Sequence, residues 1–237
     1  MTSGAGSIDP WDLSGRRLYL CTPDRPDLER FVAACIEGGV DIVQLREKHL
    51  PEDRLARRAE VVQRVCSRLG VPFILNDLPG LAADIGADGV HVGQEDMAPA
   101  AARQVLGDRA IIGLSTHDRH QLDAALTAGA EGPPTGSVAG PGPGGPVPVD
   151  YLSAGPVVPT PTKPGRPGTG LGYVTEAVRR SPWPVWVTGG VDPAAVADLA
   201  AAGVRHFVVV RWLTGADDPG ANARGLRLAI DRAIEGA

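Results

Sequence analysis

The sequence has few cysteines, no long hydrophobic run and no excess of positive charge. Its three cysteines, Cys21, Cys35 and Cys66, are scattered and form no C-x-x-C pair, which argues against a disulfide framework and a cysteine zinc site. No stretch reaches the roughly 18 apolar residues that a membrane-spanning helix needs. With a formal net charge of -5, the chain lacks a broad attraction for nucleic acid or for an anionic membrane surface. We therefore expect neither of these as a partner.

Several familiar catalytic motifs are also absent. The chain contains no H-E-x-x-H and no G-x-S-x-G motif, and its G-x-G-x-x-G-like stretch lies in a proline-rich segment. Chemistry by a metal-bound water, a serine nucleophile or a dinucleotide therefore has no support in these patterns. His91 and His117 lie near predicted strand ends without ligand spacing, so we expect hydrogen-bonded polar groups at both positions.

The first residues indicate a compartment. Residues 1–15 are polar and rich in glycine and serine, and they lack the apolar segment of a secretory signal. We expect a flexible N-terminal segment and a cytoplasmic protein, which agrees with three unpaired thiols.

Short β-rich runs alternate with helical patterns along the rest of the chain. With 237 residues and 43% apolar composition, the chain can bury a full core. Eight strand and helix units predict a single domain over 16–237, a (β/α)8 TIM barrel with parallel strands. A doubly wound open sheet is the alternative, because hydrophobic pattern alone does not close a sheet. The strands are expected at 16–22, 41–46, 72–77, 89–92, 110–116, 150–155, 184–189 and 206–211.

One segment interrupts this alternation. Residues 131–148 are about two-thirds glycine and proline, a composition that supports neither helix nor strand. The insert falls between a helix and the following strand, which in a barrel is the face opposite the catalytic groups. We expect a flexible surface loop.

Polar residues gather where the predicted strands end. In a barrel, the carboxyl ends of all strands meet at one rim. Helix capping explains a serine, aspartate or asparagine after a strand, but it does not explain a lysine or an arginine there. The residues at these ends are Gln44, Arg46, Lys48, Asn76, Asp77, Gln94, Asp96, Ser115, Thr160, Thr162, Lys163 and Arg211.

This set is typical of a diphosphate bound with a metal ion. Asp77 and Asp96 offer the hard oxygen ligands that Mg²⁺ prefers, and Mg²⁺ is commonly held by one or two carboxylates together with substrate phosphates. Arg46, Lys48 and Lys163 would neutralise the phosphates. A second anion site is expected at Gly190 and the end of the eighth strand, where barrels commonly bind phosphate through backbone N–H groups.

The ordered motifs QLREK, ND, DGVHVGQED, GLSTH, DYLSAGPVVPTPTK, TGGV and VVVR resemble the thiamine phosphate synthase family over residues 16–215 apart from the insert. The resemblance implies a (β/α)8 barrel. It also implies transfer of 4-amino-2-methyl-5-hydroxymethylpyrimidine from its diphosphate to the ring nitrogen of thiazole phosphate, which releases diphosphate. The family's reaction is dissociative and requires no protein nucleophile.

The resemblance also implies a role for each matching residue. Mg²⁺ would be held by Asp77 and Asp96, and catalysis would rest on Arg46, Lys48, Ser115 and Lys163. The pyrimidine diphosphate would be bound by Gln44, Leu45, Arg46, Glu47, Lys48 and Asn76, with Ser115 and Lys163 on its diphosphate. The thiazole phosphate would be bound by Thr160, Pro161 and Thr162, and its phosphate end by Gly190, Val210 and Arg211.

Three departures from the family pattern lie on the thiazole side. Arg211 replaces a common serine, Trp212-Leu213 replace Ala-Ile, and Val158 replaces a phenylalanine. Two alternatives stay open: a thiazole tautomerase-type paralogue that works by proton transfer, and a non-catalytic barrel that binds a phosphate metabolite and regulates a partner. The sequence also leaves the oligomeric state open, with a homo-oligomer among the options.

Overall fold

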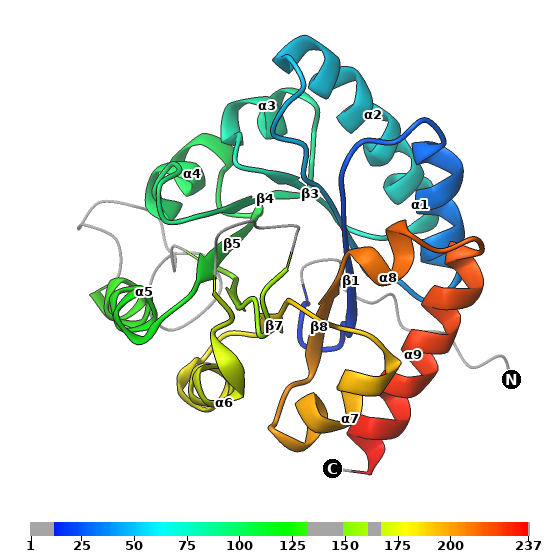
Figure 1. The fold of residues 1–237 in the computed structure, drawn as a ribbon. Coiled ribbons are helices and arrows are strands. Elements are labelled where there is room, and N and C mark those ends of the chain that lie inside the picture. Colours follow the sequence, from blue (N-terminus) through cyan, green and yellow to red (C-terminus); the bar gives the residue numbers. More distant parts are fainter. Residues whose placement is uncertain (1–11, 132–148, 161–166, 237) are drawn as a thin grey trace, which may run out of the picture.

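The computed structural model describes residues 12–131, 149–160 and 167–236. Eight parallel strands pair in chain order, and the first pairs with the last to close a barrel (Figure 1). The predicted TIM barrel is therefore confirmed, and the open sheet is wrong because Leu18 pairs with Phe207 and Tyr19 with Val208. The strands are β1 Leu18–Thr22, β2 Ile42–Leu45, β3 Phe73–Asn76, β4 Gly89–Val92, β5 Ile111–Thr116, β6 Tyr151–Ala154, β7 Val185–Val187 and β8 His206–Val209.

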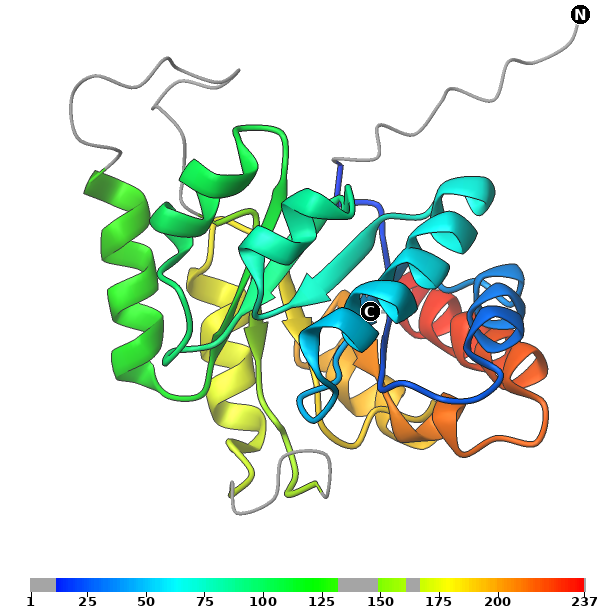
Figure 2. The same ribbon diagram turned by 90° about the horizontal axis from the view of Figure 1, so that it is seen from above.

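The helices form an outer layer around the strands (Figure 2). In the described part of the chain, none is long and apolar enough to cross a membrane. The helices are α1 Leu28–Glu37, α2 Glu52–Leu69, α3 Pro79–Asp84, α4 Pro99–Leu106, α5 Arg119–Glu131, α6 Gly170–Arg180, α7 Pro193–Ala201, α8 Arg211–Thr214 and α9 Pro219–Glu235.

Helix α2 shows how the sequence sets these elements. Its buried residues Leu55, Ala59, Val62 and Val65 repeat every three or four positions and form one apolar stripe toward the sheet. The helix ends at Gly70, whose φ of 69° is the left-handed conformation that glycine adopts without strain. The stripe and the terminator together fix where α2 lies and where β3 begins.

The strands have two faces that pack in different places. Outward residues such as Leu20 and Val43 join the core beneath the helices. Inward residues form a separate cluster along the barrel axis, in which the Tyr19 ring lies edge-on to Trp186 with centroids 5.2 Å apart. Gly113 also faces inward, and a Cβ there would overlap the Tyr151 ring. The barrel interior is thus filled by aromatic side chains.

The amino-terminal ends of the strands are closed. Leu13 is buried in the inner cluster, although residues 1–11 of the expected N-terminal segment lie outside the described residues. Asp41 accepts hydrogen bonds from the backbone N–H groups of Arg17 and Leu18 and pairs with Arg227 at 3.0 Å. Apart from residue 131, the expected insert 131–148 also lies outside the described residues. In chain order, α5 precedes this segment and β6 follows it.

Candidate active site

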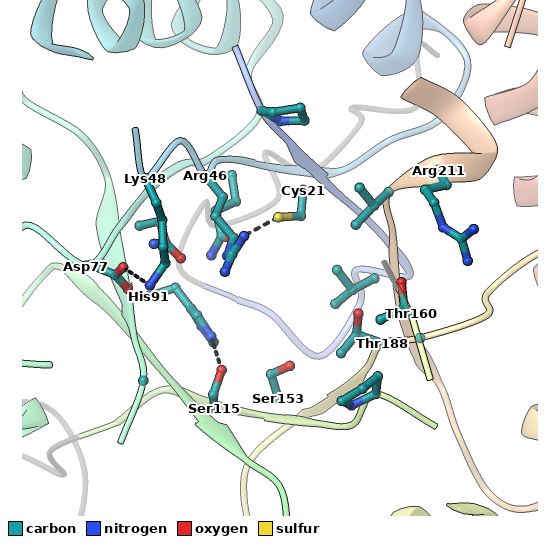
Figure 3. Close-up of a pocket in the computed structure, with 18 of the residues that line it drawn as sticks. Cys21, Arg46, Lys48, Asp77, His91, Ser115, Ser153, Thr160, Thr188 and Arg211 are labelled. Carbon is teal, nitrogen blue, oxygen red and sulfur yellow. Dashed lines mark hydrogen bonds and ion pairs between the residues drawn. The ribbon is translucent and has the colours of Figure 1, made fainter. Parts of the chain in front are cut away.

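A cavity of about 1030 Å³ opens at the carboxyl ends of the strands (Figure 3). Parallel strands in a barrel deliver these ends to one rim, so residues far apart in sequence meet there. Each strand, or for β7 the residue directly after it, contributes a residue to the lining: Cys21, Gln44, Asn76, His91, Ser115, Ser153, Thr188 and Val208. The cavity is therefore a property of the closed sheet rather than of one loop.

The cavity gathers most of the predicted site residues. Leu45 differs, because its side chain is fully buried in the core between the sheet and the helices and is not part of the lining. Pro161, Thr162 and Lys163 lie outside the described residues. The predicted residues in the lining are Gln44, Arg46, Glu47, Lys48, Asn76, Asp77, Asp96, Ser115, Thr160, Gly190, Val210 and Arg211.

Two carboxyl groups face each other at one side of the cavity. Asp77 follows β3 directly, and its φ of 67° places it in the left-handed region. Asp96 comes from the loop after β4, where its Oδ2 accepts a hydrogen bond of 2.8 Å from the N–H of Gly93. Lys48 donates from Nζ to Oδ2 of Asp77 at 2.8 Å. Three separate segments thus bring two acids and a cation together.

The charge states of the two acids depend on each other. Burial raises the pKa of Asp77, and the neighbouring Asp96 raises it further, although Lys48 opposes both effects. For Asp96, burial is outweighed by hydrogen bonds from Asp77 and from the N–H of Gly93, so its pKa is lowered. As the pH falls, Asp77 therefore takes up a proton before Asp96 does. With both groups ionised, two adjacent carboxylates fit a divalent cation that is bound with substrate oxygens.

Asp77 and Asp96 would supply two protein ligands to such a cation. Among the residues that the structure describes, no group of three or more His, Cys, Asp or Glu side chains could hold a metal ion. A buried all-protein zinc cage is therefore not formed there. Mg²⁺ differs because it commonly keeps waters and takes phosphate oxygens in addition to one or two carboxylates.

The polar groups next to the acids are held by hydrogen bonds from below. Gln44 and Asn76 are buried, and the thiol of Cys21 donates to Oε1 of Gln44 at 3.0 Å. The Arg46 side chain extends into the cavity beside Lys48 (Figure 3). Its backbone N–H donates to the carbonyl of Thr22 at 2.8 Å, which anchors the turn after β2. The cations therefore lie on the same side as Asp77.

Ser115 lies at the end of β5 and is bonded on two sides. Its Oγ lies 2.8 Å from Nε2 of His91, and its carbonyl accepts a hydrogen bond of 2.6 Å from Nε2 of Gln94. His91 is also bonded through Nδ1, which lies 3.0 Å from the hydroxyl of Tyr151. The expectation that His91 is a hydrogen-bonded polar group is confirmed.

The opposite side of the cavity has a different character. Thr160, Thr188 and Arg211 lie there, across from Lys48 and Asp77 (Figure 3). Gly190 has a φ of 80°, and a Cβ on it would overlap Cγ2 of Val158. Glycine is therefore required for this close approach. Trp212 also lines this side and is 39% exposed.

Sequence patterns missed the floor of the cavity. Cys21, Ser153 and Thr188 line it, and none of them carries a charge. A small polar residue at the last inward position of an apolar strand was the available signal, but such residues are common in strands. The cavity thus combines a neutral polar floor with charged groups on its rim, an arrangement suited to a neutral ring that carries an anionic substituent.

Comparison with known proteins gives a consistent result. The family model described as thiamine monophosphate synthase matches residues 18–140 and 145–213. A thiamine-phosphate synthase of Arthrobacter sp. (strain FB24) is 41% identical over 92% of this chain and 96% of its own length. The thiamine-phosphate synthase of Mycobacterium leprae (strain TN) is also 41% identical, over 90% of each chain.

Solved structures agree with the fold. A thiamine phosphate pyrophosphorylase from Pyrococcus furiosus has a TM-score of 0.75 at 26% identity, covering 92% of this chain and 96% of that one. A 3-hexulose-6-phosphate synthase has a TM-score of 0.61 at 19% identity, covering 90% and 99%, which supports the fold alone. Given the barrel, the rim of converging charges and these relatives, the chain belongs to the thiamine-phosphate synthase family of transferases.

Proposed function

We propose that this protein joins 4-amino-2-methyl-5-(diphosphomethyl)pyrimidine to thiazole phosphate in a Mg²⁺-dependent alkyl transfer that gives thiamine phosphate and diphosphate. One observation carries the proposal: a single cavity has acids and cations on one side, Thr160 and Arg211 on the other and a neutral floor between them. Both substrates are small molecules, and we propose a cytoplasmic location.

The acidic side would bind the diphosphate. Asp77 and Asp96 would hold Mg²⁺, which when bound neutralises charge on the phosphate oxygens. Arg46 and Lys48 would contact the same phosphates, with Lys48 moving from Asp77 to the substrate. Because Lys48 is half-exposed, this exchange costs little. Gln44 and Asn76 below them would meet the pyrimidine ring.

The opposite side would bind the second substrate. Thr160 and the N–H groups at Gly190 and Val210 offer neutral donors, and Arg211 offers a guanidinium that can bind phosphate bidentately. Pro161, Thr162 and Lys163 complete the proposed set from outside the described residues. This placement would set the thiazole nitrogen across the cavity from the departing diphosphate.

The reaction then needs charge stabilisation more than a nucleophile. The bond between the pyrimidine methylene carbon and the diphosphate oxygen breaks, and its electron pair leaves with the diphosphate. The thiazole nitrogen captures the resulting carbon cation. Arg46, Lys48, Ser115 and Lys163 would stabilise the growing negative charge, and the second site would align the acceptor.

A diphosphate-release assay tests this proposal. Purified protein with Mg²⁺ and both substrates is expected to release diphosphate and form thiamine phosphate, whereas omission of the thiazole phosphate or of Mg²⁺ should reduce the release strongly. A thiazole tautomerase-type protein would release no diphosphate and would exchange protons on its thiazole substrate. A regulatory barrel would bind a phosphate metabolite without turnover. Either result would overturn the proposal.

A further inference from the structure

A row of hydrogen bonds crosses the barrel beneath the cavity and ends at Ser115. The hydroxyl of Tyr19 lies 3.0 Å from that of Tyr151, which lies 3.0 Å from Nδ1 of His91. Nε2 of His91 lies 2.8 Å from Oγ of Ser115. All four side chains are buried, and they come from β1, β6, β4 and β5. The substrate-binding roles described above use only the last of these residues.

The direction of the protons in this row is set at its inner end. The thiol of Cys21 donates to Oε1 of Gln44, so the amide nitrogen of Gln44 points the other way. The Gln44 side chain also hydrogen-bonds the hydroxyl of Tyr19, which opposes the rise that burial causes in the pKa of Tyr19. Because Oε1 of Gln44 already accepts from Cys21, we infer that Gln44 presents its amide N–H to Tyr19 and that the Tyr19 oxygen accepts at this end.

Each following group then has one role. Tyr19 donates its proton to the oxygen of Tyr151, and Tyr151 donates to Nδ1 of His91. A neutral imidazole that accepts at Nδ1 carries its proton at Nε2. His91 therefore donates from Nε2 to Oγ of Ser115. The proton of the Ser115 hydroxyl is then directed away from His91 and into the cavity.

If the hydrogen bonds of the row ran in the opposite direction, the Ser115 hydroxyl could not donate to an anion in the cavity. Ser115 would donate to His91 and would present only lone pairs to the cavity, where they would repel phosphate oxygens. The tyrosine at the other end would then have to donate toward the amide nitrogen of Gln44, which is itself a donor. The observed orientation of Gln44 thus favours one direction for the whole row.

The fold maintains this arrangement with two further features. Gly113 lacks a side chain at the place that the Tyr151 ring occupies, so the ring can reach the barrel axis. Gln94 holds the carbonyl of Ser115 at 2.6 Å, which fixes the strand end that carries the hydroxyl. Hydrogen bonds thus hold Ser115 both at its backbone carbonyl and at its hydroxyl.

We propose that Tyr19, Tyr151 and His91 are positioning residues that fix the Ser115 hydroxyl as a hydrogen-bond donor to the departing diphosphate. The identity of the ligand in this inference rests on the proposed function. The tautomer of His91 that the inference requires does not depend on that function. Such a preset donor needs no reorientation as negative charge develops, which is how preorganised sites lower a reaction barrier.

The tautomer can be measured without substrate. Long-range ¹H–¹⁵N NMR spectra of the full-length protein at pH 7.5, with His91→Gln to assign the signals, report which ring nitrogen carries the proton. We expect a neutral His91 with the proton on Nε2. A proton on Nδ1, or protons on both nitrogens, would overturn the inference even if the protein is an active synthase.

A double-mutant cycle tests the functional part. We expect Tyr151→Phe to lower kcat by about tenfold with little change in KM, as for one lost neutral hydrogen bond. Ser115→Ala should lower kcat by about 10²-fold. If Tyr151 acts through Ser115, Tyr151→Phe should have no further effect in the Ser115→Ala background. Independent, multiplicative effects would refute the positioning role.

Ser153→Ala is the matched control, because Ser153 pairs with Ser115 in register and lines the same floor. Its effect should multiply with that of Tyr151→Phe. If Tyr151→Phe does not fold, Tyr19→Phe replaces it, with a smaller effect that should also vanish beside Ser115→Ala. An inactive wild-type protein would count against the proposed function, whereas an active one with a multiplicative cycle would count only against this inference.

Discussion

Asp77 combines a left-handed backbone, a half-buried side chain and a second carboxyl group as its neighbour. Its raised pKa means that the folded chain binds a proton there more readily than the unfolded chain does. The contribution of Asp77 to the free energy of unfolding is therefore greatest at or below the unfolded pKa of 3.8. This contribution is lost as the pH rises through the raised pKa of the folded state. At neutral pH, ionised Asp77 therefore lowers the stability of the folded protein, and we attribute this to its proposed role in binding Mg²⁺.

Asp77→Asn is expected to separate stability from activity. Asparagine resembles the protonated acid and also tolerates the left-handed conformation, so Tm without Mg²⁺ at pH 7 should rise by about 1 to 3 °C. The gain should shrink as the pH approaches 3.8. Differential scanning fluorimetry measures both, and Asp198→Asn on the exposed face of α7 is the control with no expected gain. A lower Tm for Asp77→Asn would contradict this account.

Asp96→Ala tests the metal site directly. Loss of one of two proposed carboxylate ligands should reduce Mg²⁺-dependent turnover by about 10²-fold or more, because the ion that would stabilise the departing diphosphate loses half of its protein ligands. Circular dichroism should show an unchanged fold. Asp108→Ala, an exposed aspartate on the loop before β5, should keep wild-type turnover. Full activity of the Asp96 variant would remove Asp96 from the metal site.

At the scale of the element, inward-facing glycines decide what fills the barrel. Gly113 lies in β5, and the Tyr151 ring takes the place where its side chain would be. Any Cβ at this position displaces a ring that has no free volume to enter. A glycine on a helix surface has no such role.

Gly113→Ala should therefore destabilise the protein by about 2 kcal/mol or more, seen as a fall in Tm of about 5 °C or more. The matched control is Gly172→Ala in α6, where an added Cβ would meet nothing within 4 Å. That change should leave stability unchanged or raise it by about 0.5 to 1 kcal/mol, because alanine favours a helix. Equal effects of the two substitutions would show that the strand can adjust around a larger residue.

Element boundaries show where sequence patterns stop being informative. The eight strands were predictable because apolar runs alternate with helical repeats and end at glycines or polar residues. Their ends were not, since the expected strand 206–211 stops at Val209 and Arg211 begins α8. A helix of four residues is too short to show a hydrophobic period. The turns at which Arg46 and Asp77 leave the strand hydrogen bonding depend on the closed sheet.

For the molecule as a whole, the charged rim was predictable and the neutral floor was not. Arg46, Lys48 and Asp77 stood out because ionised groups rarely end buried strands without a partner. Ser153 did not, because one hydroxyl among apolar residues resembles ordinary strand composition. Which side of the cavity each residue occupies required the closed barrel, since strand order alone leaves distances across the rim undefined.

The division between a closed side and an open side predicts where the chain tolerates change. Residues 132–148 separate α5 from the amino-terminal end of β6, so replacing them with a short Gly/Ser linker should leave kcat within roughly threefold. Inserting the same linker between Gln94 and Glu95, which line the cavity, should abolish turnover. Steady-state kinetics with both substrates checks this, and inactivity of a folded linker variant would show that the segment contributes to the site.

Trp212 gives the cavity a built-in optical reporter. Trp212 lines the cavity and is partly exposed to solvent. Trp186 is fully buried in the barrel interior and does not line the cavity. In the described part of the chain, Trp183 is the third fluorophore, and it packs beneath the helices. Binding at the proposed thiazole-phosphate side of the cavity should therefore quench tryptophan emission without a label, and Trp212→Phe should remove that change.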